Sequence, residues 1–199
     1  MCRHDVEQGS EAWLKLRSGI PTASQYKRIV TSTGKPSAQA DGYMYELLAQ
    51  WLGAEDERFE TEWMARGTEL EPEARAFYEF ETGNEVEEVG FISHPKLLTG
   101  CSPDGLVGDT GGIEIKCPKA STHVKYLLGN KCPSDYLPQV QGSMWITGRK
   151  TWDFISYHPD LDPLLVTVER DEQIMDAFSE VMPKFIDKLL TKRAELSNA

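Results

Sequence analysis

The chain has no hydrophobic run approaching the roughly 18 residues that a membrane span needs, so we expect no membrane contact. Its four cysteines (Cys2, Cys101, Cys117 and Cys132) form no CxxC pair and no zinc-like spacing. This absence predicts reduced thiols in a cytoplasm. Residues 1–5 contain no apolar segment, so we also expect no secretory signal.

Basic charge is scarce too, because 21 Lys and Arg residues stand against 32 Asp and Glu residues, a formal net charge of −11. The deficit argues against a general nucleic-acid coat protein, since affinity for phosphate comes from Lys and Arg. It does not exclude a nuclease, because a metal site needs clustered carboxylates. The segment Thr33-Gly34-Lys35-Pro36 lacks the flanking residues of a phosphate loop, so we expect no nucleotide-binding site.

The 199 residues contain no internal repeat or dividing linker, and we expect one domain over residues 1–199. Periodicity and capping residues predict helices at 10–18, 22–29, 41–52, 62–82, 120–128, 135–147 and 171–195. Short β-rich segments predict strands near 86–92, 97–101, 105–108, 112–117, 151–157 and 164–170. This order predicts an α/β fold with a central mixed β-sheet flanked by helices.

The most informative stretch is Cys101-Ser102-Pro103-Asp104-Gly105, followed by a second block at residues 112–118 (GIEIKCP). Glu114 and Lys116 are two residues apart on a short alternating strand, so their side chains leave the same face. The turn sequence at residues 109–112 (DTGG) predicts a hairpin, which would bring Asp104 beside Glu114.

These residue types suit a hard divalent cation. Mg²⁺ prefers oxygen ligands, and Asp104, Glu114 and the Ile115 backbone carbonyl could hold one or two ions against a scissile phosphate. Lys116 would then position the attacking water, or deprotonate it if its own pKa were lowered. A plain surface hairpin with a charge pair is the alternative, since such a pattern arises by chance in roughly a few per cent of chains this long.

Several blocks, taken together, are similar to one known family. They are residues 7–13 (EQGSEAW), 15–17 (KLR), 22–24 (TAS), 74–75 (AR), 101–106 (CSPDGL), 114–118 (EIKCP), 139–141 (QVQ), 143–145 (SMW) and 168–172 (VERDE). In this order they resemble the phage lambda exonuclease family, the viral recombinase-type nucleases of the PD-(D/E)xK superfamily. The resemblance implies a restriction-endonuclease-like core.

The resemblance also implies an activity: a Mg²⁺-dependent, processive 5′→3′ exonuclease on double-stranded DNA ends. Such an enzyme releases 5′ mononucleotides and leaves a 3′ single strand for a single-strand annealing protein. Two Mg²⁺ ions per site are implied, with Mn²⁺ as a substitute. The family further implies a homotrimeric ring around the duplex, in the cytoplasm of a bacterial host, with a phage or prophage origin.

Carried over by position, the resemblance assigns Asp104 and Glu114 as metal ligands and Lys116 as the catalytic lysine. Glu71 matches a further acidic active-site position. Glu71 also stands four residues before Arg75, so an ordinary helical ion pair is its alternative.

Other matched positions concern DNA. Arg17, Ser24, Ser102 and Gln139 match residues that hold a terminal 5′-phosphate, for which a guanidinium fork is well suited. The alternatives are a solvated helix end for Arg17 and a helix N-cap for Ser24. Met64 matches an apolar wedge that separates the strands, although a helical Met is commonly a core residue.

The chain departs from the family in its basic residues. The DNA-contacting loop retains a single lysine, Lys35, and Thr122 replaces a basic residue. Two other hypotheses therefore stay open. One is an endonuclease of the same fold, which would cut closed circular DNA. The other is a catalytically silent DNA-end-binding scaffold, against which the acidic cluster argues, because a scaffold gains nothing from burying like charges.

Overall fold

The computed structural model describes residues 1–54 and 62–198, apart from the side chains of residues 62–65. Its helical elements are α1 (Glu11–Arg17), the 3₁₀ helix η1 (Ala23–Arg28), α2 (Ala40–Trp51), α3 (Glu62–Thr82), α4 (Ala120–Gly129), α5 (Leu137–Thr147) and α6 (Glu172–Ser197). Its strands are β1 (Cys2–His4), β2 (Val86–Glu87), β3 (Phe91–Ser93), β4 (Gly100–Cys101), β5 (Gly105–Val107), β6 (Gly111–Lys116), β7 (Thr151–His158) and β8 (Leu161–Glu169).

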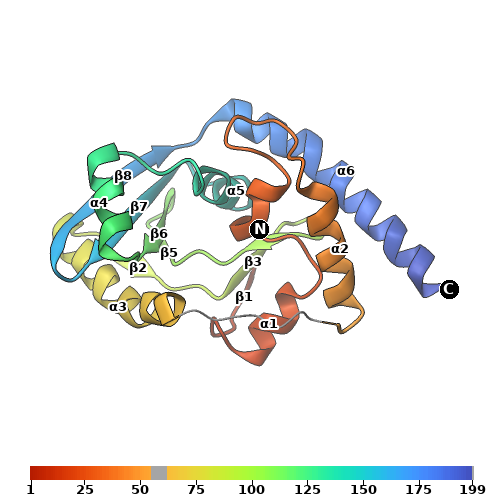
Figure 1. Ribbon diagram of the computed structural model, residues 1–199, viewed down its shortest axis with the longest axis horizontal. Coiled ribbons are helices and arrows are strands. Elements are labelled where there is room, and N and C mark those ends of the chain that lie inside the picture. The colour runs from red at the N-terminus through yellow and green to blue at the C-terminus, as the bar shows by residue number, and fades with distance from the viewer. Residues whose placement is uncertain (55–61, 199) are drawn as a thin grey trace.

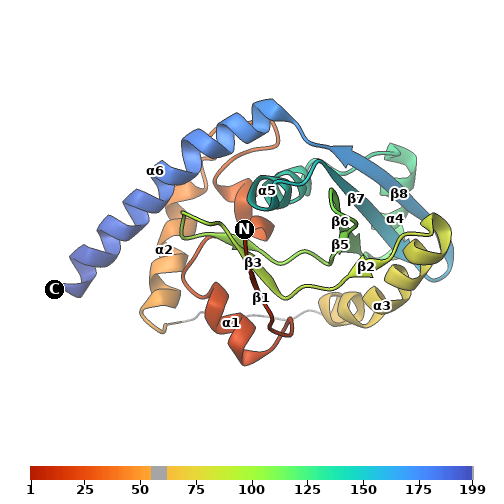
Figure 2. The same cartoon turned by 180° about the vertical axis from the view of Figure 1, so that it is seen from behind.

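The strands form two sheets (Figure 1). The larger has the order β2-β5-β6-β7-β8, in which β6 and β7 are parallel and the other pairs antiparallel. The smaller, β1-β3-β4, lies between the larger sheet and α2 (Figure 2). The predicted mixed α/β fold is thus confirmed.

One predicted strand, at residues 86–92, is wrong in its extent. The chain leaves the large sheet after β2 and enters the small sheet at β3. Residues 88–90 link the two sheets and pair with neither, so they are available to line the cavity described below.

The larger sheet separates two cores, because side chains of a strand alternate between its faces. On β7, Phe154 joins the main core, which also holds Val140 of α5. The next residue, Ile155, joins a smaller core with Ile113 of β6 and Ala74 of α3. Helix α3 therefore covers one face and α5 the other, with the strand that carries the predicted site between them (Figure 1).

Side-chain hydrogen bonds cap the starts of two of the described helices, α1 and α6. The Ser10 side chain accepts a hydrogen bond from the Trp13 backbone N–H, and the Asp171 side chain caps α6. The prediction that Asp41 caps this helix is wrong. Helix α2 begins at Ala40, and Gln39, two residues before Asp41, occupies its N-cap position. Thr22, rather than Ser24, occupies the N-cap position of η1.

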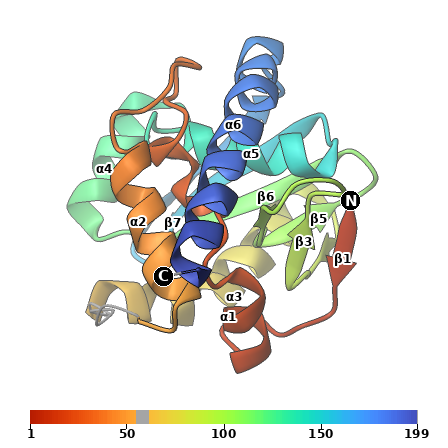
Figure 3. The ribbon, with the colours of Figure 1, turned by 90° about the vertical axis from the view of Figure 1, so that its right-hand side faces the viewer.

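The long C-terminal helix closes the main core. Figure 3 shows α6 alongside α2, and Phe185 of α6 stacks on Tyr43 of α2 with ring centroids 6.2 Å apart. Within residues 1–54 and 62–198, no helix combines the length and apolar character that crossing a membrane requires.

Candidate active site

The predicted hairpin forms, and it places Asp104 beside the strand that carries Glu114. Strand β5 follows Asp104 directly and pairs antiparallel with β6, with Gly105 opposite Ile113. Asp104 Oδ2 accepts a 2.6 Å hydrogen bond from the Ile115 backbone N–H. The Ile115 peptide therefore lies at the site, and the ligand role of its carbonyl stays a prediction.

Arg149 clamps the turn of this hairpin. Its Nη1 donates hydrogen bonds to the backbone carbonyls of Val107 (3.2 Å), Gly108 (2.7 Å) and Gly111 (2.5 Å). Three carbonyls of the turn region thus accept hydrogen bonds from one side chain, which is itself 6% exposed. The clamp fixes the register that aligns Asp104 with β6.

Glu114 and Lys116 leave the same face of β6, as their spacing predicts. The Glu114 side chain is 1% exposed, and its Oε1 pairs with the Lys116 ammonium. The same oxygen accepts a 2.5 Å hydrogen bond from Gln139 Nε2 of α5. The Lys116 ammonium also lies 5.4 Å from the Tyr136 ring centroid, so the lysine is held on two sides.

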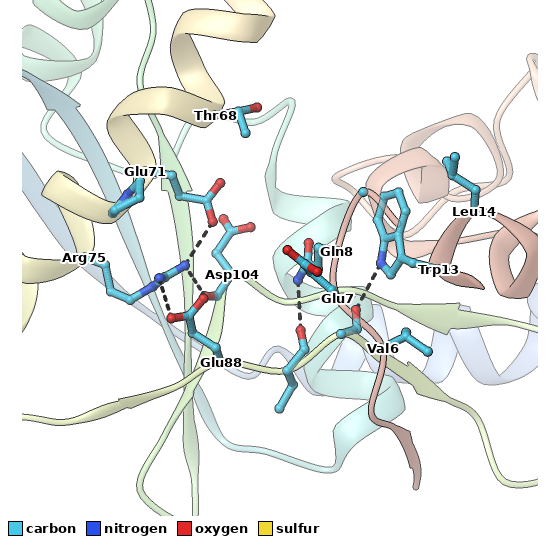
Figure 4. A pocket seen from close by; sticks show the side chains of 14 residues that line it. Val6, Glu7, Gln8, Trp13, Leu14, Thr68, Glu71, Arg75, Glu88 and Asp104 are labelled. Atoms are coloured by element: carbon cyan, nitrogen blue, oxygen red, sulfur yellow. Dashed lines mark hydrogen bonds and ion pairs between the residues drawn. The ribbon is translucent and has the colours of Figure 1, made fainter. Parts of the chain in front are cut away.

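Glu71 reaches the same region from α3. Its Oε1 accepts a 3.2 Å contact from Arg75 Nη2, so the predicted i,i+4 pair exists. Arg75 also contacts Glu88 (2.8 Å) and the Asp104 backbone oxygen (3.5 Å). Figure 4 shows the Glu71 carboxyl group beside Asp104. The ion pair thus aims Glu71 at the hairpin.

The carboxyl groups of this acidic cluster (Glu71, Asp104 and Glu114) have raised pKa values. Burial raises the pKa of Glu114 to about 7, with the Asp104 charge adding to the effect and Lys116 opposing it. Burial and the Asp104 charge raise the pKa of Glu71 to about 7. The Asp104 pKa is raised by burial, although Lys116, the Ile115 N–H and Arg75 counteract it. Like charges held this close favour a cation between them.

Lys116 responds in the opposite direction. Burial lowers its pKa, but the charges of Glu114 and Asp104 outweigh that effect and raise the pKa above the usual value. With the charges of Glu114 and Asp104 uncompensated, the ammonium form of Lys116 is favoured, and a role of Lys116 in deprotonating water stays a prediction. An ammonium that keeps its proton can orient a water or donate to a phosphate oxygen.

The acidic cluster suits a divalent metal ion. Glu114 Oε2 is buried and has no hydrogen-bond partner among the described residues, a costly state that an ion would relieve. Among the described residues, no three His, Cys, Asp or Glu side chains close around one point as a complete cage. Mg²⁺ does not require one, since it is commonly bound by one or two carboxylates and keeps several waters.

A cavity of about 920 Å³ opens beside the cluster (Figure 4). Glu71, Arg75, Glu88 and Asp104 line one end of it, which we call the acidic end. The other end is lined by Val6–Gly9, Trp13 and Leu14. Such a cavity leaves room for a substrate group between α1 and α3.

Two of the predicted phosphate-binding residues meet beside this second end. Arg17 Nη1 donates a 2.7 Å hydrogen bond to Ser102 Oγ, and Trp13 Nε1 donates to the same oxygen at 2.9 Å. The Arg17 guanidinium lies over the Trp13 ring, 4.0 Å from its centroid. We call Trp13, Arg17 and Ser102 the donor end of the site.

The other two predicted phosphate ligands are placed differently. Gln139 donates to Glu114 and thus belongs with the acidic cluster. Ser24 lies 3.3 Å from the Thr22 hydroxyl, and Thr22 forms a β-bridge with Gly100, two residues before Ser102. Ser24 is therefore near the strand of the donor end, and its role in binding phosphate stays a prediction.

Lys35 and Met64 are not brought to the site by any described contact. Lys35 lies in a turn whose Gly34 faces the first part of α6, where an added Cβ would stand 3.4 Å from that of Ala177. Met64 belongs to α3, but its side chain lies outside the described residues. Both DNA-contacting roles stay predictions.

Sequence reasoning assigned no part in the site to Gln8, Trp13, Arg75 and Glu88, which line the cavity, and considered Arg75 only as an ion-pair partner of Glu71. Gln8 Nε2 donates to the carbonyls of Val89 (2.9 Å) and Pro103 (2.8 Å), which ties the N-terminal segment to the loop of Asp104. Gln8, Trp13 and Arg75 stand in the blocks that carry the family resemblance, which was the available signal. Glu88 had none.

The comparisons with known proteins fit this geometry. A family model described as the YqaJ-like viral recombinase domain matches residues 12–150. The chain belongs to this family. The resemblance to the lambda exonuclease family is thereby confirmed.

Solved structures agree with this assignment of a YqaJ-like viral recombinase. The chain is 38% identical to an alkaline exonuclease, LHK-Exo, from Laribacter hongkongensis, with a TM-score of 0.86 over 95% of this chain and 97% of that one. LHK-Exo in complex with dAMP matches with a TM-score of 0.85 and 39% identity over the same shares of each chain. An Escherichia coli (strain K12) protein named ExoD is 37% identical over 78 residues, 37% of this chain and 90% of ExoD. This YqaJ-like protein is a nuclease of a metal-dependent family.

Proposed function

We propose that the chain is a Mg²⁺-dependent exonuclease that degrades double-stranded DNA processively from 5′ ends, releasing 5′ mononucleotides and leaving a 3′ single strand. One observation carries this proposal. Three carboxyl groups from two separate parts of the chain, Glu71, Asp104 and Glu114, converge with Lys116 next to a cavity. The other end of the same cavity is lined by Trp13, which contacts the phosphate-compatible groups Arg17 and Ser102.

In this proposal Asp104, Glu114, Glu71 and the Ile115 carbonyl hold two Mg²⁺ ions, for which Mn²⁺ can substitute. The unpartnered Glu114 Oε2 and the raised pKa values of the cluster support this role. When bound, a divalent ion neutralises phosphate charge and lowers the pKa of a coordinated water.

The protein's own groups orient the reactants. Lys116 stays protonated and donates hydrogen bonds to a water or a phosphate oxygen beside Glu114. Gln139 and Tyr136 restrict the positions of Glu114 and Lys116, so less conformational entropy is lost when the substrate binds.

The donor end accounts for an exonuclease rather than an endonuclease. Arg17 and Ser102 bind the terminal 5′-phosphate, with Ser24 and Gln139 completing the pocket. Ser102 is two residues from Asp104, so a bound terminal phosphate sets the distance to the bond that is cut. The dAMP complex of LHK-Exo supports a 5′ mononucleotide product.

The remaining parts of the proposal come from the viral recombinase family. The chain forms a homotrimeric ring around duplex DNA and passes the 3′ strand to a single-strand annealing protein. It acts in the cytoplasm of a bacterial host and derives from a phage or prophage. Met64 separates the strands, and Lys35 contacts the duplex.

The test uses linear duplex and covalently closed circular DNA, each incubated with and without Mg²⁺ and analysed on a gel. We expect the linear DNA alone to be degraded, and only with Mg²⁺. Cutting of closed circles would identify an endonuclease. Binding of ends without degradation would identify a scaffold, and either result would contradict the proposal.

A further inference from the structure

The Ser102 hydroxyl stands at the meeting point of two hydrogen-bond donors. The Trp13 indole N–H reaches Ser102 Oγ at 2.9 Å, and Arg17 Nη1 reaches it at 2.7 Å. An indole N–H and a guanidinium can only donate. In both contacts Ser102 must therefore act as the acceptor.

This arrangement fixes the polarity of Ser102. A hydroxyl group has two acceptor lone pairs and one donor proton. Trp13 and Arg17 occupy both lone pairs, so the proton is the only hydrogen-bonding capacity left. Among residues 1–54 and 62–198, Ser102 donates that proton to no acceptor that the structure describes. The group that fits it is an acceptor without protons of its own, such as a phosphate oxygen.

Trp13 contacts both other residues of the donor end, Arg17 and Ser102. Its N–H also donates to the Gly90 carbonyl at 3.1 Å, which anchors the indole beside Ser102. Its ring supports the Arg17 guanidinium 4.0 Å from the centroid, one helical turn further along α1. One indole thus governs the direction of two phosphate-binding groups.

We propose that Trp13 is a positioning residue for the terminal 5′-phosphate: its N–H turns Ser102 into an obligate donor, and its ring holds Arg17 in place. This inference rests on the proposed function, because it presupposes that the donor end binds a 5′-phosphate. A merely structural Trp13 would anchor α1 to residue 90 without affecting which DNA ends are preferred.

The experiment compares Trp13→Phe with the parent. Phenylalanine keeps an aromatic ring under Arg17 but lacks the N–H. The rates of degradation of 5′-phosphorylated and 5′-hydroxyl linear duplex give a preference ratio. We expect this ratio to fall roughly fivefold, mainly through a higher KM for phosphorylated ends, because a charge-assisted hydrogen bond is weakened.

Trp145→Phe is the matched control. The Trp145 indole N–H also donates to a serine hydroxyl, Ser179 Oγ at 3.0 Å, but on the α5–α6 side of the molecule. We expect this variant to keep the parent ratio. An equal fall in both variants would show a general effect of indole loss and would overturn the inference.

A double variant tests the route through Ser102. If Trp13 acts by fixing the Ser102 proton, most of its effect disappears once Ser102→Ala has removed that proton. The preference ratio of Trp13→Phe/Ser102→Ala should then lie only slightly below that of Ser102→Ala. The fall from the parent to Trp13→Phe should be far larger. Fully additive losses would refute this route.

The outcomes separate the inference from the proposed function. A parent that prefers phosphorylated ends, with an unchanged ratio in Trp13→Phe, overturns the inference and leaves the proposed function standing. A parent without end preference contradicts the phosphate pocket of the proposed function, and the inference fails with it.

A second measurement applies if thermal melting shows that Trp13→Phe does not fold. The indole N–H signals of the ¹⁵N-labelled parent are recorded during titration with inorganic phosphate, and again in Ser102→Ala. We expect both treatments to shift the same signal, because Ser102→Ala removes an acceptor of the Trp13 N–H and phosphate binds the hydroxyl group that serves as this acceptor. Shifts of different signals, or no shift, would overturn the inference.

Discussion

The two ends of the cavity differ in how far their polar groups are satisfied. At the acidic end, burial raises the pKa of Asp104, and burial together with the Asp104 charge raises the pKa values of Glu71 and Glu114. Among the described residues, Glu114 Oε2 has no hydrogen-bond partner. At the donor end, Ser102 Oγ already accepts two hydrogen bonds, and Arg17 is stacked on Trp13.

This difference separates holding a substrate from reacting with it. Donors that are preassembled bind an anion without further rearrangement. Burial disfavours the charged forms of the carboxyl groups, and a bound cation stabilises them. The acidic end is therefore completed by its metal ion. The net charge of −11 therefore says little about DNA binding, because the opposite charges act at opposite ends of one cavity.

The largest expected effect is at the acidic end. Asp104→Asn and Lys116→Met should each lower nucleotide release from linear duplex by roughly a thousandfold or more, because both remove charge where the transition state needs it. The matched control is Asp109→Asn, an exposed acid in the turn of the same hairpin. It should retain near-parent rates. Parent-like activity of Asp104→Asn or Lys116→Met would refute the site.

A smaller and more selective effect is expected at the donor end. Arg17→Ala should reduce the preference for 5′-phosphorylated over 5′-hydroxyl ends by roughly 10- to 100-fold, the cost of a lost charge-assisted contact. Lys15→Ala, an exposed cation on the same helix, is the control and should keep the ratio. If Arg17→Ala degraded both kinds of end at the parent ratio, the donor end would have no role in end recognition.

The smallest effect is a pH dependence of stability. Glu71 and Glu114 have an ordinary pKa of 4.5 and folded-state values of about 7, so the folded protein favours their protonated forms. Their contribution is therefore fully present below pH 4.5 and is lost as the pH rises through 7. Because Mg²⁺ binds the deprotonated groups, it should raise Tm at pH 8 by roughly 3–5 °C more than at pH 6.

Calorimetric or fluorescence-monitored melting checks this prediction. Glu114→Gln removes one titrating group and should reduce the difference between the two pH values. An equal Mg²⁺ effect at pH 6 and pH 8 would show that the acidic cluster is not the ion's site.

Local structure was predictable from the sequence wherever neighbouring residues determine it. The DTGG turn at residues 109–112 and the alternation of Ile113 with Ile115 were sufficient for the hairpin and for the shared face of Glu114 and Lys116. The Ser10 cap was predictable for the same reason. The cap of α2 was not, because Asp41 is a preferred capping residue type but its carboxylate pairs with the Lys188 ammonium of α6, while Gln39 occupies the N-cap position without a side-chain hydrogen bond.

Features that depend on distant segments were beyond such patterns. The run from Val86 to Ile92 has a strand-like composition throughout, yet it divides between two sheets because each half finds a different partner strand. Arg149 gave no signal of its function, since its three acceptors are carbonyls about 40 residues earlier.

The sequence by itself determined which groups of this protein are chemically competent: two acids and a lysine on one hairpin, whose period and turn are local properties of the chain. Only the tertiary structure decided that Glu71 joins them, that the charges of Glu114 and Asp104 raise the pKa of Lys116, and that Trp13 and Arg17 both donate to Ser102 Oγ. The physical reason is that burial and hydrogen-bond direction depend on neighbours that are remote in sequence, and no short segment contains them.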